Sequence, residues 1–296
     1  MKKKIILVTG ATDGIGKTTA MELAAAGNRV IVHGRSAEKA KAVVAEISQA
    51  TGNEEVDYLL ADLFSPDAIK NMATQFEKSF DHLDVLINNA GAVFDKERRE
   101  TAEGIEITMA LNVMAPFLLN ELLLPSLRKS REGRIINMSS ASHRASGKPD
   151  MNDLNFEHVD SAQRRYSLSK LFVIWNTQTR AHLLQERGIA NVAVNASHPG
   201  TVATDFGQSS DKGFWTNLIY RSAISLAKIP PIGRAFSVEH GAATNIYLAT
   251  SENVKGVSGR YFGNSTEQKP YAKYASDQNK QKLWDYCMSV AAPFLK

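Results

Sequence analysis

A tyrosine and a lysine four residues apart can carry out acid–base chemistry. Tyr166 and Lys170 lie near the start of a predicted helix at 164–187, and positions four apart share one helical face. A phenol has a pKa of about 10, and lowering it by roughly three units requires about 4 kcal/mol. A cation at about 4 Å supplies about that much at an effective dielectric constant of about 20. Lys170 can therefore tune Tyr166 for proton transfer, although such pairs also occur on helices by chance.

Two further polar positions precede this pair in the chain. Ser139 and Ser140 follow a predicted strand at 134–137, where a hydroxyl can hydrogen-bond a substrate carbonyl, although adjacent serines also cap turns. Asn112 lies within an apolar helical stretch, and a buried amide needs hydrogen-bond partners. A water-bridged relay to Lys170 and a purely structural hydrogen bond explain this asparagine equally well.

Short apolar runs alternate with longer amphipathic stretches, and these predict the elements that position the polar side chains. Apolar character predicts strands at 5–9, 29–33, 56–61, 85–88, 134–137 and 191–197, with a short last strand near 259–262. Helical periodicity covers 16–27, 37–51, 66–80, 103–129, 164–187 and 240–249. Strands that are apolar on both faces and alternate with helices predict an α/β fold, a doubly wound parallel sheet with helices on both faces. No repeat or linker divides the chain, so a single domain over residues 1–296 is expected.

A glycine-rich turn joins the first predicted strand to the first helix. Residues 9–16 are Thr-Gly-Ala-Thr-Asp-Gly-Ile-Gly. Glycine lets the backbone turn sharply and lets a phosphate approach closely, and the N-terminus of the following helix attracts anions. This context predicts a Rossmann-type dinucleotide site, with an ordinary strand-to-helix turn as the alternative. The residues expected to contact the cofactor here are Gly10, Thr12, Asp13, Gly14, Ile15 and Gly16.

The end of the second predicted strand indicates which dinucleotide binds. An NAD site usually has an acidic residue there for the ribose 2′-hydroxyl, whereas residues 32–36 contain Arg35 and no acid. A guanidinium suits a 2′-phosphate in charge and geometry, so NADP(H) is the predicted cofactor. The alternative is that Arg35 is a solvated loop residue. Lys17 can add positive charge, but an ordinary exposed helix position explains it better.

Composition excludes several other classes of protein. The 296 residues are 43% hydrophobic and 22% charged, as in soluble globular proteins. The net charge of +4 is small and spread along the chain, so no nucleic-acid partner is expected, and no Cys/His spacing resembles a metal site. The single cysteine, Cys287, favours a reducing compartment, and a cytoplasmic location is expected. The apolar run at 5–8 is too short for a signal peptide or a membrane span and predicts a strand.

An irregular segment at about 205–238 is predicted to be an insertion that forms a substrate lid. It follows the sixth strand, near the carboxyl ends of the strands, where ligands bind in open α/β sheets. Aromatic side chains expected to line an apolar pocket or its lid are Phe206, Phe214, Trp215 and Tyr220. Core packing or a partner surface explains them equally well, and residues 206–235 can instead contact a membrane surface.

Together these segments resemble the short-chain dehydrogenase/reductase family. The resemblance rests on the turn at 9–16, on Asn88-Asn89-Ala90-Gly91, on Tyr166 with Lys170, and on His198-Pro199-Gly200-Thr201-Val202-Ala203-Thr204. It covers at least residues 4–262 in the expected order. It implies an oxidoreductase that moves a hydride between NADP(H) and an alcohol/carbonyl pair.

The family resemblance also implies roles for individual residues. Tyr166 would protonate the carbonyl oxygen during reduction, and Ser140, the second serine of its pair, would polarise that carbonyl. Lys170 would hold the ribose and lower the pKa of the tyrosine, and Asn112 would support a water relay. The cofactor contacts implied beyond the turn are Asp62 and Leu63 at the adenine, Asn89, Ala90 and Gly91, Tyr166 and Lys170, and Pro199, Gly200, Val202 and Thr204.

Shorter similarities indicate the retinol-dehydrogenase-like branch of the family. They are Gly34-Arg35, Ser139-Ser140-Ala141-Ser142-His143, Ser197-His198-Pro199-Gly200 and Gly259-Arg260-Tyr261-Phe262. This branch often reduces lipophilic aldehydes or ketones, so the chain is expected to be an NADPH-dependent reductase of a small lipophilic carbonyl substrate, with Ser140, Tyr166, Phe206, Phe214 and Trp215 contacting it. The alternatives are a hydroxysteroid or other secondary-alcohol dehydrogenase and a non-catalytic NADP(H)-binding sensor. The sequence leaves a homo-oligomer and a peripheral membrane contact open.

Overall fold

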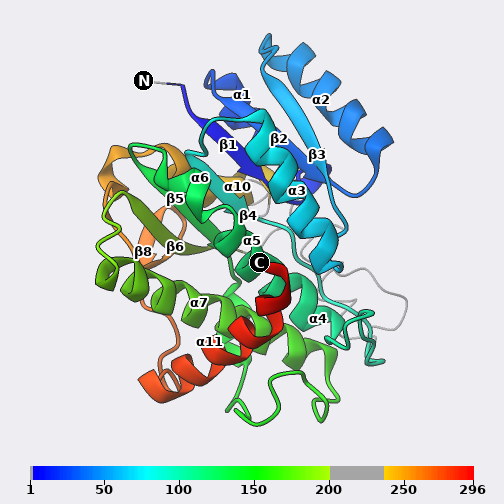
Figure 1. Cartoon of the computed structure of the whole chain (residues 1–296), viewed down its shortest axis with the longest axis vertical. Helices are drawn as coiled ribbons and strands as arrows, with labels where there is room; N and C mark the ends of the chain where they lie inside the picture. The colour runs from blue at the N-terminus through cyan, green and yellow to red at the C-terminus, as the bar shows by residue number, and fades with distance from the viewer. Residues whose placement is uncertain (1–2, 201–236) are drawn as a thin grey trace.

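One twisted sheet sets the positions of those segments singled out above that lie within the described residues. The computed structural model describes residues 3–200 and 237–296, and in these residues eight strands form a single sheet in the order β3-β2-β1-β4-β5-β6-β7-β8 (Figure 1). The strands are β1 (Ile5–Val8), β2 (Arg29–Gly34), β3 (Val56–Leu60), β4 (Val85–Asn88), β5 (Gly133–Met138), β6 (Val192–His198), β7 (Tyr261–Gly263) and β8 (Thr266–Gln268). All neighbouring pairs are parallel except β7 with β8. The predicted doubly wound α/β fold is therefore confirmed.

Helices cover both faces of this sheet. The helices are α1 (Gly14–Ala25), α2 (Ala37–Thr51), α3 (Pro66–Ser79), α4 (Ile107–Met109), α5 (Ala115–Leu122), α6 (Leu124–Arg128), α7 (Ala162–Glu186), α10 (Val238–Thr250) and α11 (Asp277–Ala291). In β1, Ile6 and Val8 belong to a core cluster shared with α1, α2 and α10. Leu7 belongs instead to the cluster shared with α3, α5, α7 and α11. Because successive strand residues point to opposite faces, a fully apolar strand fills both cores.

The order of the strands places a crevice beside β1. The chain runs outward from β1 to β2 and β3 and then returns to β4 on the other side of β1. The carboxyl ends of β1 and β4 therefore diverge at a topological switch point, where open α/β sheets bind their ligands. The glycine-rich turn follows β1 and the segment 89–91 follows β4, so both lie at this crevice.

The structure corrects the predicted helix at 103–129. It consists of four shorter pieces: α4, a π-helix over Ala110–Met114, α5 and α6. Proline occupies one of the first two positions of both α5 and α6, where its missing N–H is tolerated. The sequence pattern did not indicate these interruptions, because the regular apolar spacing continues through all four pieces.

The chain beyond residue 262 contains a strand, β8, and a helix, α11, that were not predicted. β8 pairs antiparallel with β7 through a tight turn at Asn264 and Ser265, both with positive φ. Helix α11 packs along α7 (Figure 1), and its Trp284 meets the ring of Phe117 edge-on at 4.9 Å. The predicted insertion at about 205–238 lies outside the described residues, except that Ser237 caps α10 and Val238 begins it.

A buried histidine at the end of β2 fixes the glycine-rich turn to the sheet. His33 is 2% exposed, and its Nδ1 accepts a hydrogen bond from the Gly10 N–H at 3.1 Å. Its Nε2 lies 3.2 Å from the Ala61 carbonyl oxygen, so this nitrogen carries the proton and the ring is neutral. Burial, together with a smaller contribution from the charge of Arg35, lowers the pKa of His33 to about 4. Protonation would remove the acceptor on which the turn depends.

This pairing predicts a loss of stability in acid. A histidine with a depressed folded-state pKa contributes stability above its unfolded pKa of 6.5, and that contribution is lost as the pH falls from 6.5 towards 4. Between pH 7 and pH 4.5 the free energy of unfolding should fall by about 2 kcal/mol more in the parent protein than in the variant His33→Gln. Urea denaturation of both proteins at the two pH values measures the difference. Equal losses would contradict a neutral, buried His33.

Candidate active site

Two glycines let main-chain segments approach one another closely at the crevice, and a third faces open space. Gly10 has φ +61°, and a Cβ there would lie 3.0 Å from the Cα of Ala90. A Cβ on Gly16 would collide with the carbonyl oxygen of Gly10. Gly14 also has a positive φ, +52°, and a Cβ there would meet nothing within 4 Å. The turn is therefore packed against the segment after β4 on one side and open on the other.

The first turn of α1 is capped from within the same motif. Asp13 is the N-cap residue, and its carboxylate accepts a hydrogen bond from the Gly14 N–H at 2.7 Å. The helix thus begins at Gly14 rather than at residue 16. Thr12 lies against Gly34 at the end of β2, and Ile15 is half-buried. The remaining N–H groups of this first turn have no acceptor within the helix, as at any helix N-terminus.

The segment after β4 is held directly against the glycine-rich turn. The Asn89 amide donates to the carbonyl oxygens of Thr9 at 2.9 Å and Gly10 at 3.2 Å. The Ala90 N–H donates to the Thr9 hydroxyl at 3.0 Å. The structure therefore brings Asn89, Ala90 and Gly91 to the same edge as the turn.

Gly91 is where two of the four tetrad candidates meet. A Cβ on Gly91 would lie 3.0 Å from Nζ of Lys170 and 3.1 Å from Oδ1 of Asn112. Asn112 is 1% exposed; its Oδ1 accepts from the Ala92 N–H at 3.0 Å, and its Nδ2 donates to the Ala92 carbonyl oxygen at 3.0 Å. The amide of Asn112 therefore has a structural role on this segment, and it also places a carbonyl oxygen beside Lys170.

Lys170 is buried beside Tyr166 on α7. Its Nζ donates to the Met138 carbonyl oxygen at 3.0 Å and lies 5.6 Å from the centre of the Tyr166 ring. Burial lowers the pKa of Lys170 to about 8. The ammonium is thus charged at neutral pH but loses its proton more readily than an exposed lysine.

The two adjacent serines after β5 have different environments. Ser139 is 2% exposed, and its hydroxyl donates to the Lys170 carbonyl oxygen at 2.7 Å. Ser140 is half-buried, and its hydroxyl accepts from the N–H of Ser142 at 3.2 Å and from its hydroxyl at 2.9 Å. The Ser139 hydroxyl is therefore bonded to α7, whereas the Ser140 hydroxyl accepts both of these bonds, which leaves its own O–H to donate.

The other predicted cofactor residues lie around the same edge. Arg35 is exposed after β2, while Lys17 pairs with Glu46 of α2 at 2.6 Å. Asp62 is exposed and its carboxylate accepts from the Phe64 N–H at 3.1 Å. The Leu63 side chain is 5% exposed and packs in the core.

The predicted contacts after β6 are only partly described. Pro199 and Gly200 are half-buried, and the Gly200 N–H donates to Nδ1 of His198 at 3.1 Å. The predicted residues Val202, Thr204, Phe206, Phe214, Trp215 and Tyr220 lie outside the described residues.

Ser169 and His143, to which no role was assigned from the sequence, hold neighbouring segments of the site in place. The Ser169 hydroxyl donates to the Tyr166 carbonyl oxygen at 2.7 Å. The same hydroxyl accepts a hydrogen bond from the Asn112 amide at 3.1 Å. Nδ1 of His143 lies 2.7 Å from the Ser140 carbonyl oxygen, and its Nε2 accepts from the Tyr271 N–H at 3.0 Å. Burial lowers the pKa of His143, which suits the neutral ring that these partners require. The signal in the sequence for Ser169 and His143 was that both are polar and lie close to predicted site residues.

Two other kinds of site find no support in the described part of the chain. Residues 3–200 and 237–296 contain no group of three His, Cys, Asp or Glu side chains that could hold a metal ion. In the same residues, no helix combines the length and the apolar character that crossing a membrane requires.

Comparisons with known proteins agree with this geometry. The sequence pattern of the short chain dehydrogenase family matches residues 4–214. Human retinol dehydrogenase 13 is 35% identical over 284 residues, which cover 95% of this chain and 82% of that protein. Human polyprenol dehydrogenase is 34% identical over 287 residues, covering 95% and 83% of the two chains.

A solved structure gives the same result for the fold. A protein described as a short chain dehydrogenase from Escherichia coli CFT073, solved with NADPH, is 25% identical and has a TM-score of 0.66. The match covers 89% of this chain and 97% of that one. The chain therefore belongs to the short chain dehydrogenase family of oxidoreductases and is similar to its retinol dehydrogenases.

Proposed function

We propose that the chain is an NADP(H)-dependent oxidoreductase that reduces a lipophilic aldehyde or ketone to its alcohol, or catalyses the reverse reaction. One observation carries the proposal. Lys170 Nζ and Asn112 Oδ1 both approach the main chain at Gly91, directly after β4 at the crevice. Tyr166 lies four residues before Lys170 on the same helix, so an acid, a cation and an amide oxygen share one site.

The residues around the crevice fit a dinucleotide. The N-terminus of α1 offers unpaired N–H groups and a partial positive charge to a pyrophosphate, and the open side of Gly14 leaves room for it. Arg35 is exposed at the end of β2, where its guanidinium would hold the 2′-phosphate of NADP(H). When bound, the nicotinamide supplies or accepts the hydride.

Tyr166 would act as the proton donor to the carbonyl oxygen during reduction. The Lys170 ammonium lies 5.6 Å from the centre of the Tyr166 ring, and its positive charge would favour the phenolate. The Met138 carbonyl oxygen fixes the ammonium on this side of α7. Lys170 would also hold the cofactor ribose.

Ser140 and Asn112 would complete the tetrad. The Ser140 hydroxyl has its own O–H left to donate and would hydrogen-bond the substrate carbonyl, which polarises it. Asn112 Oδ1 lies close to Lys170 at Gly91 and would accept from a water that returns protons to the lysine. Its bonds to Ala92 hold this oxygen in a fixed position.

The substrate proposal draws on the relatives. Two of them are named for retinol and polyprenol, which are both long apolar isoprenoid alcohols, so a lipophilic carbonyl substrate is favoured over a small polar one.

We place the enzyme in the cytoplasm, because its one cysteine, Cys287, is a buried free thiol and suits a reducing compartment.

Replacing the proposed acid tests the chemistry. With NADPH and a panel of long-chain and aromatic aldehydes, Tyr166→Phe should lower kcat at least about 100-fold, because general acid catalysis contributes about that much. NADPH fluorescence should give a dissociation constant within about threefold of the parent's, since cofactor contacts persist. The control is Tyr58→Phe, which removes a hydroxyl from β3 at the far edge of the sheet.

Three outcomes would change this assignment. Appreciable turnover by Tyr166→Phe would remove the tyrosine as the acid. Tight NADPH binding without turnover of any aldehyde by the parent would favour the non-catalytic sensor. Faster turnover of ketones and secondary alcohols than of aldehydes would instead favour the secondary-alcohol dehydrogenase.

The cofactor preference is tested at Arg35. Arg35→Asp should lower the ratio of kcat/KM with NADPH to kcat/KM with NADH at least about tenfold, because a charged hydrogen bond contributes about 1.5–3 kcal/mol. Lys41→Asp is the matched control, since it makes the same charge change at an exposed position of α2. If both variants give the same ratio, Arg35 does not hold a 2′-phosphate.

A further inference from the structure

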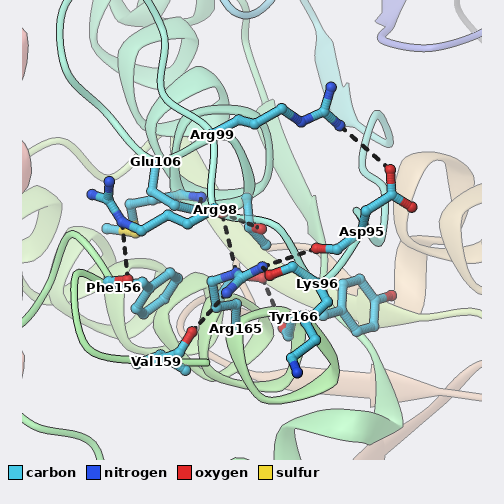
Figure 2. Close-up of polar contacts among 12 residues, drawn as sticks. Asp95, Lys96, Arg98, Arg99, Glu106, Phe156, Val159, Arg165 and Tyr166 are labelled. Carbon is cyan, nitrogen blue, oxygen red and sulfur yellow. Dashed lines mark hydrogen bonds and ion pairs between the residues drawn. The ribbon is translucent and has the colours of Figure 1, made fainter. Parts of the chain in front are cut away.

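The residue before Tyr166 is a buried arginine that joins three separate segments. Arg165 is 1% exposed, and Figure 2 shows its guanidinium at the centre of a set of polar contacts. It donates to the carbonyl oxygens of Val159 at 2.6 Å, Asp95 at 2.9 Å and Lys96 at 2.8 Å. A single side chain on α7 thus bonds the loop that leads into this helix and a stretch about 70 residues earlier.

The fourth partner of Arg165 is a carboxylate with no exposure to solvent. Glu106 is 0% exposed, and its Oε1 lies 3.3 Å from Nε of Arg165. The same carboxylate accepts from the Thr108 hydroxyl and from the Met109 N–H, each at 2.9 Å. Glu106 is thereby the N-cap of α4, and α4 runs directly into the π-helix that carries Asn112.

Residues 92–96, the wall segment, are consequently held at both ends. Asn112 bonds the N–H and the carbonyl oxygen of Ala92, and Arg165 bonds the carbonyl oxygens of Asp95 and Lys96. The wall segment continues directly from Gly91, where Lys170 and Asn112 converge. A shift of Arg165 would therefore displace the tetrad residues by two routes, through the wall segment and through Glu106.

We propose that Arg165, paired with Glu106, is a positioning residue that fixes the wall segment and the Asn112 helix relative to Tyr166. A buried ion pair contributes little net stability, because desolvation of both charges offsets their attraction. Its value lies in geometry, since one planar guanidinium donates to three carbonyl oxygens in fixed directions and meets the Glu106 carboxylate as an ion pair. The kinetic part of this inference rests on the proposed function.

Helix α7 supplies a matched control for the charge itself. Arg180 is 3% exposed, and its Nη2 bonds Oε1 of Glu121 at 2.7 Å. It lies 14 residues after Tyr166 on the same helix (180 minus 166), which is about 21 Å along the axis. Arg165→Met and Arg180→Met therefore each remove a buried guanidinium from a glutamate, one beside the site and one far from it.

The experiment compares kinetics and stability in these two variants. Both should lower the melting temperature, but Arg165→Met should lower kcat for aldehyde reduction at least about tenfold, as a misplacement of about 1 Å can. Arg180→Met should keep kcat within about twofold of the parent's, and the NADPH dissociation constant should stay within about threefold in both. Equal kcat values in the two variants would overturn the proposal.

Two further variants separate geometry from charge balance. Arg165→Lys keeps the charge and up to three donors, and it should recover the melting temperature and part of kcat. The double variant Arg165→Met with Glu106→Gln leaves no unpaired buried carboxylate, so it should recover melting temperature relative to Arg165→Met but not kcat. Recovery of kcat by the double variant would mean that only charge balance matters.

Hydrogen exchange tests the positioning role without any substrate. The Ala92 N–H, which donates to Asn112, should exchange at least about tenfold faster in Arg165→Met than in Arg180→Met, which corresponds to about 1.4 kcal/mol of lost protection. If the parent reduces no carbonyl compound, the proposed function fails, and exchange still decides this inference. Equal exchange at Ala92 in both variants would overturn it.

Discussion

Close approach of main chains at the switch point is the constraint on which the site depends. Gly10 and Gly16 leave no room for a side chain between the turn after β1 and the segment after β4. Gly91 likewise leaves its space to the Lys170 ammonium and the Asn112 amide. Because a Cβ at any of these positions would displace a backbone or a functional group, the dinucleotide turn and the proposed tetrad are parts of one packing arrangement.

Buried polar groups then fix that arrangement, and each does so through main-chain atoms. His33 accepts from Gly10, Lys170 donates to Met138, and Arg165 donates to Asp95 and Lys96. A buried polar group that lacks a partner costs about 1–3 kcal/mol, so each of these side chains specifies where its loop must lie. The loops of this site therefore have defined positions although they contain little regular structure.

The fold was predictable from sequence to the extent that each element had a local signal. Strands buried on both faces gave continuous apolar runs, and their alternation with helices gave the parallel sheet. Helix α11 also had a local pattern, with buried Leu283, Trp284, Cys287 and Ala291 on one side and Ser276 as its N-cap, but no helix was predicted there. The π-helix had no such signal, because it depends on tertiary hydrogen bonds.

The site residues were likewise predictable only where the signal was local. Tyr166 and Lys170 could be placed together because helical spacing is local. No local pattern shows that the guanidinium of Arg165 binds carbonyl oxygens 69 and 70 residues earlier in the chain, since any backbone carbonyl can accept.

The π-helix shows how such contacts affect the chemistry of the site. Its extra residue rotates the following side chains by about 100° relative to a regular α-helix, and π-helical turns are rare and concentrate at functional sites. Here the turn contains Asn112, whose bonds to Ala92 and Ser169 compensate for the irregular backbone while directing its oxygen toward Lys170. Asn112 was predicted from the sequence as a buried amide, whereas the π-helix and the bonds to the wall segment that hold this amide had no local signal.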